Sequence, residues 1–250
     1  MLPISIVILS KNEELNIARC VNSVKGLTAE ILVIDSGSTD KTIPLAISSG
    51  AKVIDEIWKG YSETKNIGNE HAAHDWILSL DADEEMNPEL RSAIESIFSK
   101  EIKVRMAFCV RRKMVYCGKV LHHGSQSWEY RKRLFNRQTA HWNHNDVHED
   151  LDFSVPMKIK KLKGFLWHHS YNTSEEHRER LEKYAQMSAT QLSKKGKKAT
   201  FIKRYLSPAF GFIKNFIFKG GFLDGKKGFQ FALNEMWYVK RKYQLLKALS

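Results

Sequence analysis

The sequence predicts an α/β fold, and three observations support it. Apolar, β-branched runs of strand length alternate with helical patterns through the first 100 residues. Polar segments follow three of these runs, and a basic, aromatic segment of different character ends the chain. Strands that alternate with helices indicate βαβ units and a mostly parallel sheet, in which ligands bind beyond the carboxyl ends of the strands. We therefore expect the three polar segments to converge on one edge of the sheet.

The expected elements of the first half follow in a regular order. Strands are predicted at 4–9, 30–34 and 76–80, with a further helix–strand unit at 45–54. Helices are predicted from Asn12 to about residue 24, over 62–73 and over 88–98. Asn12 and Asn87 can cap the first and last of these helices, and Pro88 suits a first helical position. Beyond residue 104 shorter strand-like runs are expected at 106–110, 133–135 and 165–167, then a helix at about 175–192.

The composition is that of a folded soluble protein, with 42% hydrophobic and 27% charged residues. Three cysteines, Cys20, Cys109 and Cys117, are too few and too irregularly spaced for a disulfide framework or a zinc motif, so a reducing setting is expected. The N-terminus shows no signal-peptide pattern. Residues 194–250 contain fourteen Lys and Arg against two Asp and Glu, which is the whole net charge of +12. This asymmetry predicts an anionic partner for the end of the chain.

Two carboxylates, Asp81 and Asp83, follow the predicted strand at 76–80. In an extended chain, side chains two residues apart point roughly the same way, so the two charges repel each other. A hard divalent cation removes that cost, and Mg²⁺ is commonly held by one or two carboxylates and substrate phosphates. A solvated turn is the other interpretation of this short pattern. The segments 10–13 and 35–40 are expected beside these carboxylates at the sheet edge.

Taken together, the motifs resemble those of a family 2 glycosyltransferase of GT-A fold. The resemblance is carried by four segments in order, Ser5–Glu13, Ile34–Asp40, Lys65–Gly68 and Leu80–Glu84. Val147–Glu149 and Gly221–Gly228 further resemble a subgroup that builds the lipopolysaccharide core, including inner-core β-glucosyltransferases. The resemblance implies a GT-A domain over 1–193 with a nucleotide-sugar half (1–100) and an acceptor half (101–193). A basic helical extension over 194–250 would follow.

The resemblance implies transfer of a hexose, with glucose the first candidate, from a UDP-sugar with inversion at the anomeric carbon. It assigns donor binding to Ser10, Asn12, Glu13, Asp35, Ser38, Asp40, Lys65, Asp81 and Ala82. Asp35 would bond the uracil edge, and Lys65 would lie near the diphosphate. Asp83 would be the main ligand of a divalent ion (Mn²⁺ or Mg²⁺), with Asp81 touching the ribose or a metal-bound water and His148 completing the metal site.

A carboxylate base is needed for the acceptor hydroxyl, on the sugar face opposite the diphosphate. The segment 143–150 offers Glu149 as the first candidate and Asp146 as the second. His144 and His148, four residues apart, also have the spacing of a zinc pair on a helix, although helix propensity is poor there. The clusters 122–123, 131–133 and 168–169 are interpreted as polar surface groups, with Arg133 a candidate contact for an anionic acceptor.

The final segment interleaves aromatic residues with lysines from 201 to 222, and its longest uncharged run has nine residues, too short to span a bilayer. This pattern predicts contact with an anionic membrane surface, where a lipid-linked glycan acceptor would lie. The expected location is the cytoplasmic, inner face of a bacterial inner membrane. Packing of the aromatics on the catalytic domain is the alternative.

Other functions remain open at this stage. The acceptor could be a capsule or exopolysaccharide glycan, a polyprenyl carrier or a protein. A nucleotidyltransferase would also use two aspartates and a metal. A basic nucleic-acid-binding protein would fit the tail, but no nucleic-acid-binding motif is found, so no nucleic-acid partner is expected.

Overall fold

The computed structural model describes residues 1–100, 102–125, 127–143 and 149–249. They form two compact units. The first comprises residues 1–112 and 129–168, and the second comprises 113–128 and 169–250. The helix α5 (Ser174–Lys194) is part of the second unit, so this division lies elsewhere than the functional boundary predicted after residue 193. The functions assigned to the two ranges stay predictions.

The first unit begins with four parallel strands. They are β1 (Ile4–Ser10), β2 (Glu30–Asp35), β3 (Lys52–Asp55) and β4 (Trp76–Asp81), in the order β3-β2-β1-β4. The helices α1 (Ile17–Val24), α2 (Thr42–Ser49) and α3 (Tyr61–His71) connect them. The alternation predicted from the sequence is confirmed here, with strand ends displaced by one residue. The predicted start of the first helix is wrong, because α1 begins at Ile17 and Asn12, expected to cap it, has a left-handed φ of 52°.

The sheet then becomes mixed. Its order continues from β4 through β8 (Trp128–Asn136), β6 (Met106–Tyr116) and β11 (Lys158–Tyr171) to β5 (Glu84–Met86). β8 is antiparallel to β4, and β5 is antiparallel to β11. The three strands β6, β8 and β11 are much longer than the short runs expected, and they make the sheet less parallel than predicted. β9 (Ala140–Trp142) and β10 (Leu151–Phe153) form a separate antiparallel pair.

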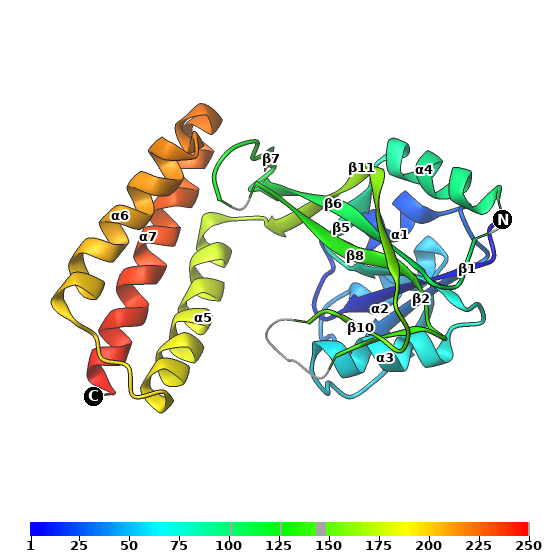
Figure 1. Cartoon of the computed structure of the whole chain (residues 1–250), viewed down its shortest axis with the longest axis horizontal. Helices are drawn as coiled ribbons and strands as arrows, with labels where there is room; N and C mark the ends of the chain where they lie inside the picture. The colour runs from blue at the N-terminus through cyan, green and yellow to red at the C-terminus, as the bar shows by residue number, and fades with distance from the viewer. Residues whose placement is uncertain (101, 126, 144–148, 250) are drawn as a thin grey trace. The chain divides into compact units, whose positions relative to one another are not determined.

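The two faces of β1 bury different cores. Ile4, Ile6 and Ile8 pack with α1, α2 and α4 (Pro88–Phe98), whereas Val7 and Leu9 pack with the β9–β10 pair. Successive strand side chains point to opposite faces, so an unbroken apolar run is required where both faces are covered. Figure 1 shows α4 and α3 on opposite sides of the sheet. This packing leaves the strand ends as the accessible edge.

Gly68 lets α3 approach the sheet closely. A Cβ at this position would lie 2.6 Å from Val7 Cγ1 and 2.8 Å from Ile34 Cγ1, closer than side chains tolerate. Two residues earlier, Asn66 exchanges two 2.9 Å hydrogen bonds with the backbone of Trp142 on β9. The segment Lys65–Gly68 therefore fixes α3 between the sheet and β9, with Lys65 held in place by both contacts.

The second unit is mainly helical, and α5 packs against the long helix α7 (Gly225–Ala248). Between them come the short helices η1 (Ile202–Leu206), α6 (Ser207–Ile213), η2 (Lys214–Phe218) and η3 (Gly221–Asp224). The predicted helix at about 175–192 is confirmed as α5, and Thr173 caps it by accepting a 3.0 Å hydrogen bond from Glu176 N. Within the described ranges, no helix is both long enough and apolar enough to cross a bilayer.

The segment Gly221–Gly228 has a structural role in this unit. A Cβ at Gly228 would lie 2.1 Å from the carbonyl oxygen of Gly221, so the start of α7 requires glycine there. Asp224 is buried, and its carboxylate accepts hydrogen bonds from the backbone N–H groups of His122 (3.1 Å) and His123 (2.9 Å). Buried carboxylates need such partners. The motif thus ties the 121–125 loop to the first turn of α7.

Candidate active site

The strand register places three of the predicted site residues in line. Ser10 pairs with Asp35 across β1 and β2, and Leu9 pairs with Asp81 across β1 and β4. All three strands end together, so the loops that follow them share one edge of the sheet. The convergence predicted from the sequence is therefore present in the fold.

The loops after β1 and β2 are joined to each other by hydrogen bonds. Asn12 N donates to Ser38 Oγ (2.8 Å), and Asn12 Oδ1 accepts from Thr39 N (2.8 Å). Asn12 has a φ of 52°, in the left-handed region that asparagine tolerates better than most residues. Glu13 N donates to Thr42 Oγ1 (2.7 Å). The candidate donor-binding residues of the two loops thus form one bonded surface.

Asp35 and Asp40 organise the second of these loops. Asp35 is buried, and its two carboxylate oxygens accept hydrogen bonds from Ser38 N (2.7 Å) and Ser38 Oγ (2.6 Å). Asp40 accepts from Thr42 N (3.0 Å) at the start of α2 and from Glu14 N (3.1 Å). Ser10 Oγ is buried and has no hydrogen-bond partner among the described residues. A buried hydroxyl without a partner is costly, so this group is a candidate for a ligand contact.

Lys65 connects the rim of the sheet, which is the edge formed by the carboxyl ends of β1, β2 and β4, to the second half of the unit. Its side chain is 1% exposed, and its ammonium nitrogen lies 2.9 Å from Asp81 Oδ1 and 2.7 Å from Glu149 Oε1. The same nitrogen lies 4.8 Å from the centroid of the Trp142 ring, within cation–π range. A buried ammonium needs paired charges of this kind. The geometry brings together a predicted diphosphate contact, a predicted metal-site aspartate and the predicted base.

Two arginines surround the other side of Asp81. Arg133 is buried and bonds Asp81 Oδ2 (2.5 Å) and Glu84 Oε1 (2.6 Å), while Arg112 lies 3.6 Å from Asp81 and 3.4 Å from Glu84. Burial raises the pKa of Asp81, but the charges of Arg133, Lys65 and Arg112 outweigh it and hold that pKa well below its ordinary value. Asp81 is therefore ionised and fully paired with protein cations.

Asp83 has a different environment from Asp81. Its Oδ2 lies 3.1 Å from His168 Nε2, and its Oδ1 is buried with no hydrogen-bond partner among the described residues. Burial raises the pKa of Asp83, but the charge of His168 and its hydrogen bond outweigh it, so the pKa is lowered. The backbone between the aspartates is fixed, because Ala82 is buried and its N–H donates to Leu9 O (3.1 Å).

The side chains of Asp83 and His168 have donor atoms of the kinds that would suit a divalent ion. Oxygen and imidazole donors suit such ions, and the unpartnered Oδ1 of Asp83 is an open acceptor. The described part of the chain contains no group of three His, Cys, Asp or Glu side chains arranged to hold a metal without substrate. His148, predicted as a metal ligand, lies outside the described residues.

The candidate base segment is described only in part. Glu149 Oε1 is paired with Lys65, and its Oε2 is buried without a partner among the described residues. Asp150 instead binds Lys132, at 2.7 Å. Asp146, the second candidate base, and the His144–His148 zinc alternative lie outside the described residues. Of the two candidate bases, Glu149 is the one that lies among the described residues, and its carboxylate contacts Lys65.

The charged cluster comprises the described residues Lys65, Asp81, Asp83, Glu84, Arg112, Arg133, Glu149 and His168. The sequence did not predict several of these members. Arg133 and His168 were expected in polar surface groups, yet Arg133 is buried against Asp81 and Glu84, and His168 bonds Asp83. Arg112 and Glu84 were not singled out as site residues. Arg133 and His168 each lie on a long strand of the antiparallel half. The short runs expected there do not show which residues pair across neighbouring strands. Only the strand pairing brings them to the aspartates.

Several relatives resemble this chain over most of its length. An uncharacterized glycosyltransferase of Rickettsia typhi is 33% identical over 237 residues, covering 92% of this chain and 81% of the relative. LpsC of Rhizobium meliloti, a lipopolysaccharide core biosynthesis glycosyltransferase, is 27% identical over 244 residues, covering 95% and 89%. Among solved structures, glucosyl-3-phosphoglycerate synthase of Mycobacterium tuberculosis is 26% identical over 46% of this chain and 43% of that one. Its TM-score is 0.36.

The family model described as glycosyl transferase family 2 matches residues 5–165. This range contains every described residue of the charged cluster except His168, which lies three residues beyond it. The mixed sheet with flanking helices agrees with the GT-A fold that the motifs implied. The resemblance stated from the motifs is confirmed, and the protein is a glycosyltransferase that belongs to glycosyl transferase family 2.

Proposed function

We propose that this glycosyltransferase transfers a hexose, with glucose the first candidate, from a UDP-sugar to the lipopolysaccharide core with inversion. The observation that carries the proposal is the position of Lys65 between Asp81 and Glu149. In the proposed reaction Lys65 would bind the diphosphate, and Glu149 would take the proton of the acceptor hydroxyl. The reaction needs one of these groups on each side of the reacting carbon.

The donor would lie along the bonded loops and the charged rim. Asp35 and Ser38 would meet the uracil, and Ser10, Asn12, Glu13 and Asp40 would shape that end of the site. Lys65 and Arg133 would face the diphosphate, where negative charge grows as the bond to the sugar breaks. A divalent ion held by Asp83 and His168, with Asp81 nearby, would supply Lewis-acid stabilisation of the leaving UDP.

Glu149 would act as the general base. The acceptor oxygen forms a bond to the anomeric carbon while the bond from that carbon to the diphosphate oxygen breaks, and the acceptor proton passes to Glu149. Oε1 of Glu149 is bound to Lys65, so Oε2, which has no partner among the described residues, is the oxygen that would take the proton. Asp146 remains the second candidate.

The acceptor proposal is supported by the LpsC relative, whose name gives lipopolysaccharide core biosynthesis as its role. A heptose/Kdo core is attached to lipid, so the enzyme would work as a peripheral protein on the cytoplasmic face of the inner membrane. The relative covers nearly the whole chain, including the segment 221–228 that the motifs linked to this subgroup.

The test is transfer from a panel of UDP-hexoses to purified lipopolysaccharide truncated at the heptose/Kdo core. The reactions contain Mn²⁺ or Mg²⁺, and mass spectrometry detects the product. The expected result is a mass increase of one hexose with one donor, dependent on metal and lost in Asp83→Asn. An unchanged acceptor with every donor, while another glycan or a polyprenyl phosphate is glycosylated, would contradict the proposed acceptor.

A further inference from the structure

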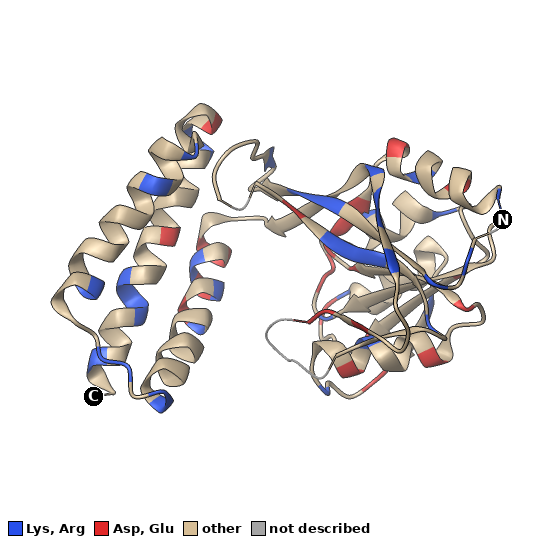
Figure 2. Cartoon of the chain, in the orientation of Figure 1, with Lys and Arg blue, Asp and Glu red and all other residues tan. Residues whose placement is uncertain are grey.

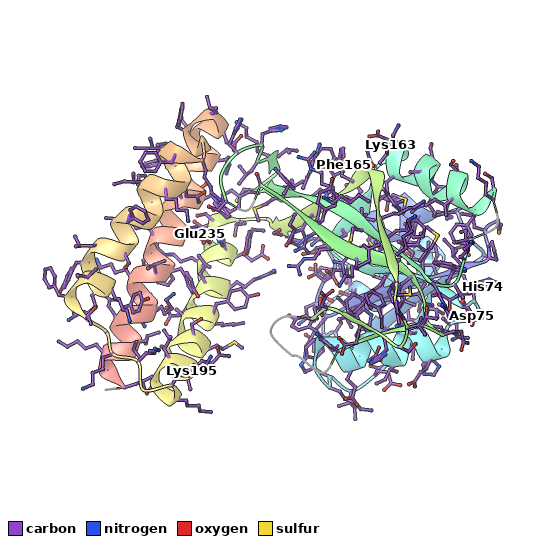
Figure 3. All side chains as sticks on the ribbon, viewed as in Figure 1. His74, Asp75, Lys163, Phe165, Lys195 and Glu235 are labelled. Atoms are coloured by element: carbon purple, nitrogen blue, oxygen red, sulfur yellow. The ribbon has the colours of Figure 1, made fainter. Side chains whose placement is uncertain are left out.

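An exposed apolar stripe runs along the helices η1, α6 and η2. Its members share one helical face and are between 40% and 62% exposed: Ile202, Leu206, Phe210, Ile213 and Ile217. Spacings of three and four residues place side chains one above another on a helix. Phe218, at the end of the stripe, is 74% exposed. Figure 3 shows side chains, several with rings, projecting from α6 on the side away from α7.

The opposite side of the same helices is packed. Pro208 and Asn215 are buried, and α6 contacts α7. Asn215 Oδ1 accepts a 2.7 Å hydrogen bond from Ser125 N, so the orientation of the helices is fixed within the second unit. The stripe is therefore the outer face of an anchored element. An apolar face that stays exposed on an anchored element marks an interaction surface.

Cations flank the stripe, and acidic residues do not. From Lys194 to Leu223 the sequence contains no Asp or Glu, while Lys203, Arg204, Lys214 and Lys219 lie among the apolar residues. Figure 2 shows Lys and Arg along α6 and α7, with acidic residues sparse there. The surface therefore combines aliphatic and aromatic side chains with an uncompensated positive charge.

We propose that this stripe inserts into the surface of an anionic phospholipid membrane. Helices of this kind lie in the interface with their apolar face in the acyl boundary and their lysines at the lipid head groups. A second copy would bring two equally basic surfaces together, which disfavours self-association. Four of the five stripe residues are aliphatic and cannot stack on bases, which disfavours a nucleic acid. The inference deepens the proposed function, since a lipid-anchored acceptor would be met at this surface, but it can be tested without the acceptor.

The test is co-sedimentation of the full chain with vesicles of phosphatidylglycerol and phosphatidylcholine, against phosphatidylcholine alone, at 0.1 M salt. We expect binding to the anionic vesicles only. Leu206→Asn/Phe210→Asn/Ile217→Asn should lower the partition coefficient at least about ten-fold. Lys203→Gln/Lys214→Gln/Lys219→Gln should lower it on the order of a hundred-fold.

Matched control variants come from exposed residues of the first unit. Ile47→Asn/Ile57→Asn and Lys158→Gln/Lys160→Gln/Lys163→Gln alter similar side chains elsewhere and should change the partition coefficient less than about two-fold. Circular dichroism and thermal stabilisation by UDP with Mn²⁺ check that each variant is folded. If UDP stabilises no form of the protein while vesicle binding follows the pattern above, the proposed function fails and this inference stands.

Three outcomes would overturn the inference. One is equal binding of wild type to anionic and neutral vesicles, or none to either. Another is an equal loss of binding in stripe and control variants. The third is a wild-type dimer in sedimentation velocity that the stripe substitutions convert to monomer, or a DNA duplex that binds the same surface in preference to the vesicles.

Discussion

The ammonium group of Lys65 lies 2.7 Å from Oε1 of Glu149, although 84 positions separate the two residues in the sequence. The same nitrogen lies 2.9 Å from Asp81 Oδ1. One buried cation therefore joins the aspartate rim of the parallel sheet to the segment that carries the candidate base. The predictions below follow from this arrangement and from the packing that supports it.

Replacing Lys65 should cost both stability and donor binding. Lys65→Met leaves the carboxylates of Asp81 and Glu149 without this cation, and breaking a buried pair in this way costs about 3 kcal/mol of unfolding free energy. Urea unfolding measures the loss. Lys52→Met, at an exposed position on β3, is the control and should change stability by less than about 0.5 kcal/mol. Equal stability of the two variants would show that the Lys65 contacts contribute nothing.

Glu149→Gln should slow sugar transfer without weakening donor binding. The substitution keeps the shape of the side chain but removes the proton acceptor, so kcat should fall about 10²- to 10⁴-fold while the donor KM changes little. Steady-state kinetics with saturating acceptor measures both constants. Wild-type kcat in Glu149→Gln, with a large loss in Asp146→Asn, would transfer the role of base to Asp146.

His168→Gln should weaken metal binding without unfolding the protein. In the proposed metal site His168 is one of two protein ligands. Its removal should therefore lower Mn²⁺ affinity, measured by electron paramagnetic resonance in the presence of UDP, by at least about ten-fold. His74→Gln, outside the charged cluster, is the matched control. The metal assignment to His168 would be wrong if both variants bound Mn²⁺ as wild type does.

Gly68→Ala should destabilise the first unit. The added methyl group would meet Val7 and Ile34 within 3 Å, and overpacking of this kind costs about 1–3 kcal/mol. Gly211 on α6 has no atom within 4 Å of an added Cβ, so Gly211→Ala should be neutral or slightly stabilising. Thermal unfolding compares the two. A neutral Gly68→Ala would mean that α3 can move away from the sheet at little cost.

Asp40 should make stability depend on pH in the acid range. Burial raises its pKa, but hydrogen bonds from the Thr42 hydroxyl and from the N–H groups of Thr42 and Glu14 outweigh it, so its folded pKa is lowered. The stabilisation is therefore complete above the unfolded pKa of about 4 and is lost as pH falls through the lower folded pKa. Asp40→Ala should lose about 1 kcal/mol at pH 7 and less at pH 3. An equal loss at both pH values, by urea unfolding, would contradict this.

The parallel half of the fold was predictable because its signals are local. Each buried strand is a continuous apolar run, and polar residues mark the point where it ends, so the alignment of Ser10, Asp35 and Asp81 follows from the strand order. The antiparallel half was not predictable from local signals. Charged residues interrupt β6 and β11, at Arg111–Lys113 and Lys158–Lys163, and conceal their length from a search for apolar runs.

The charged cluster was the least predictable part of the site. Lys65 and Arg133 are residue types that are seldom buried, and their burial depends on carboxylates from other strands and loops. No local pattern reports such a pairing. The packing of α5 against α7 could not be predicted from the sequence either. It depends on buried residues of both helices, such as Leu181, Ala185 and Phe231.

The most direct test of the account is a crystal structure of the protein soaked with UDP and Mn²⁺. We predict the diphosphate between Lys65 and Asp83, the uracil beside Asp35, and the manganese on Asp83 and His168. A diphosphate bound away from this rim, or aspartates 81 and 83 in contact with neither metal nor nucleotide, would contradict the central claim.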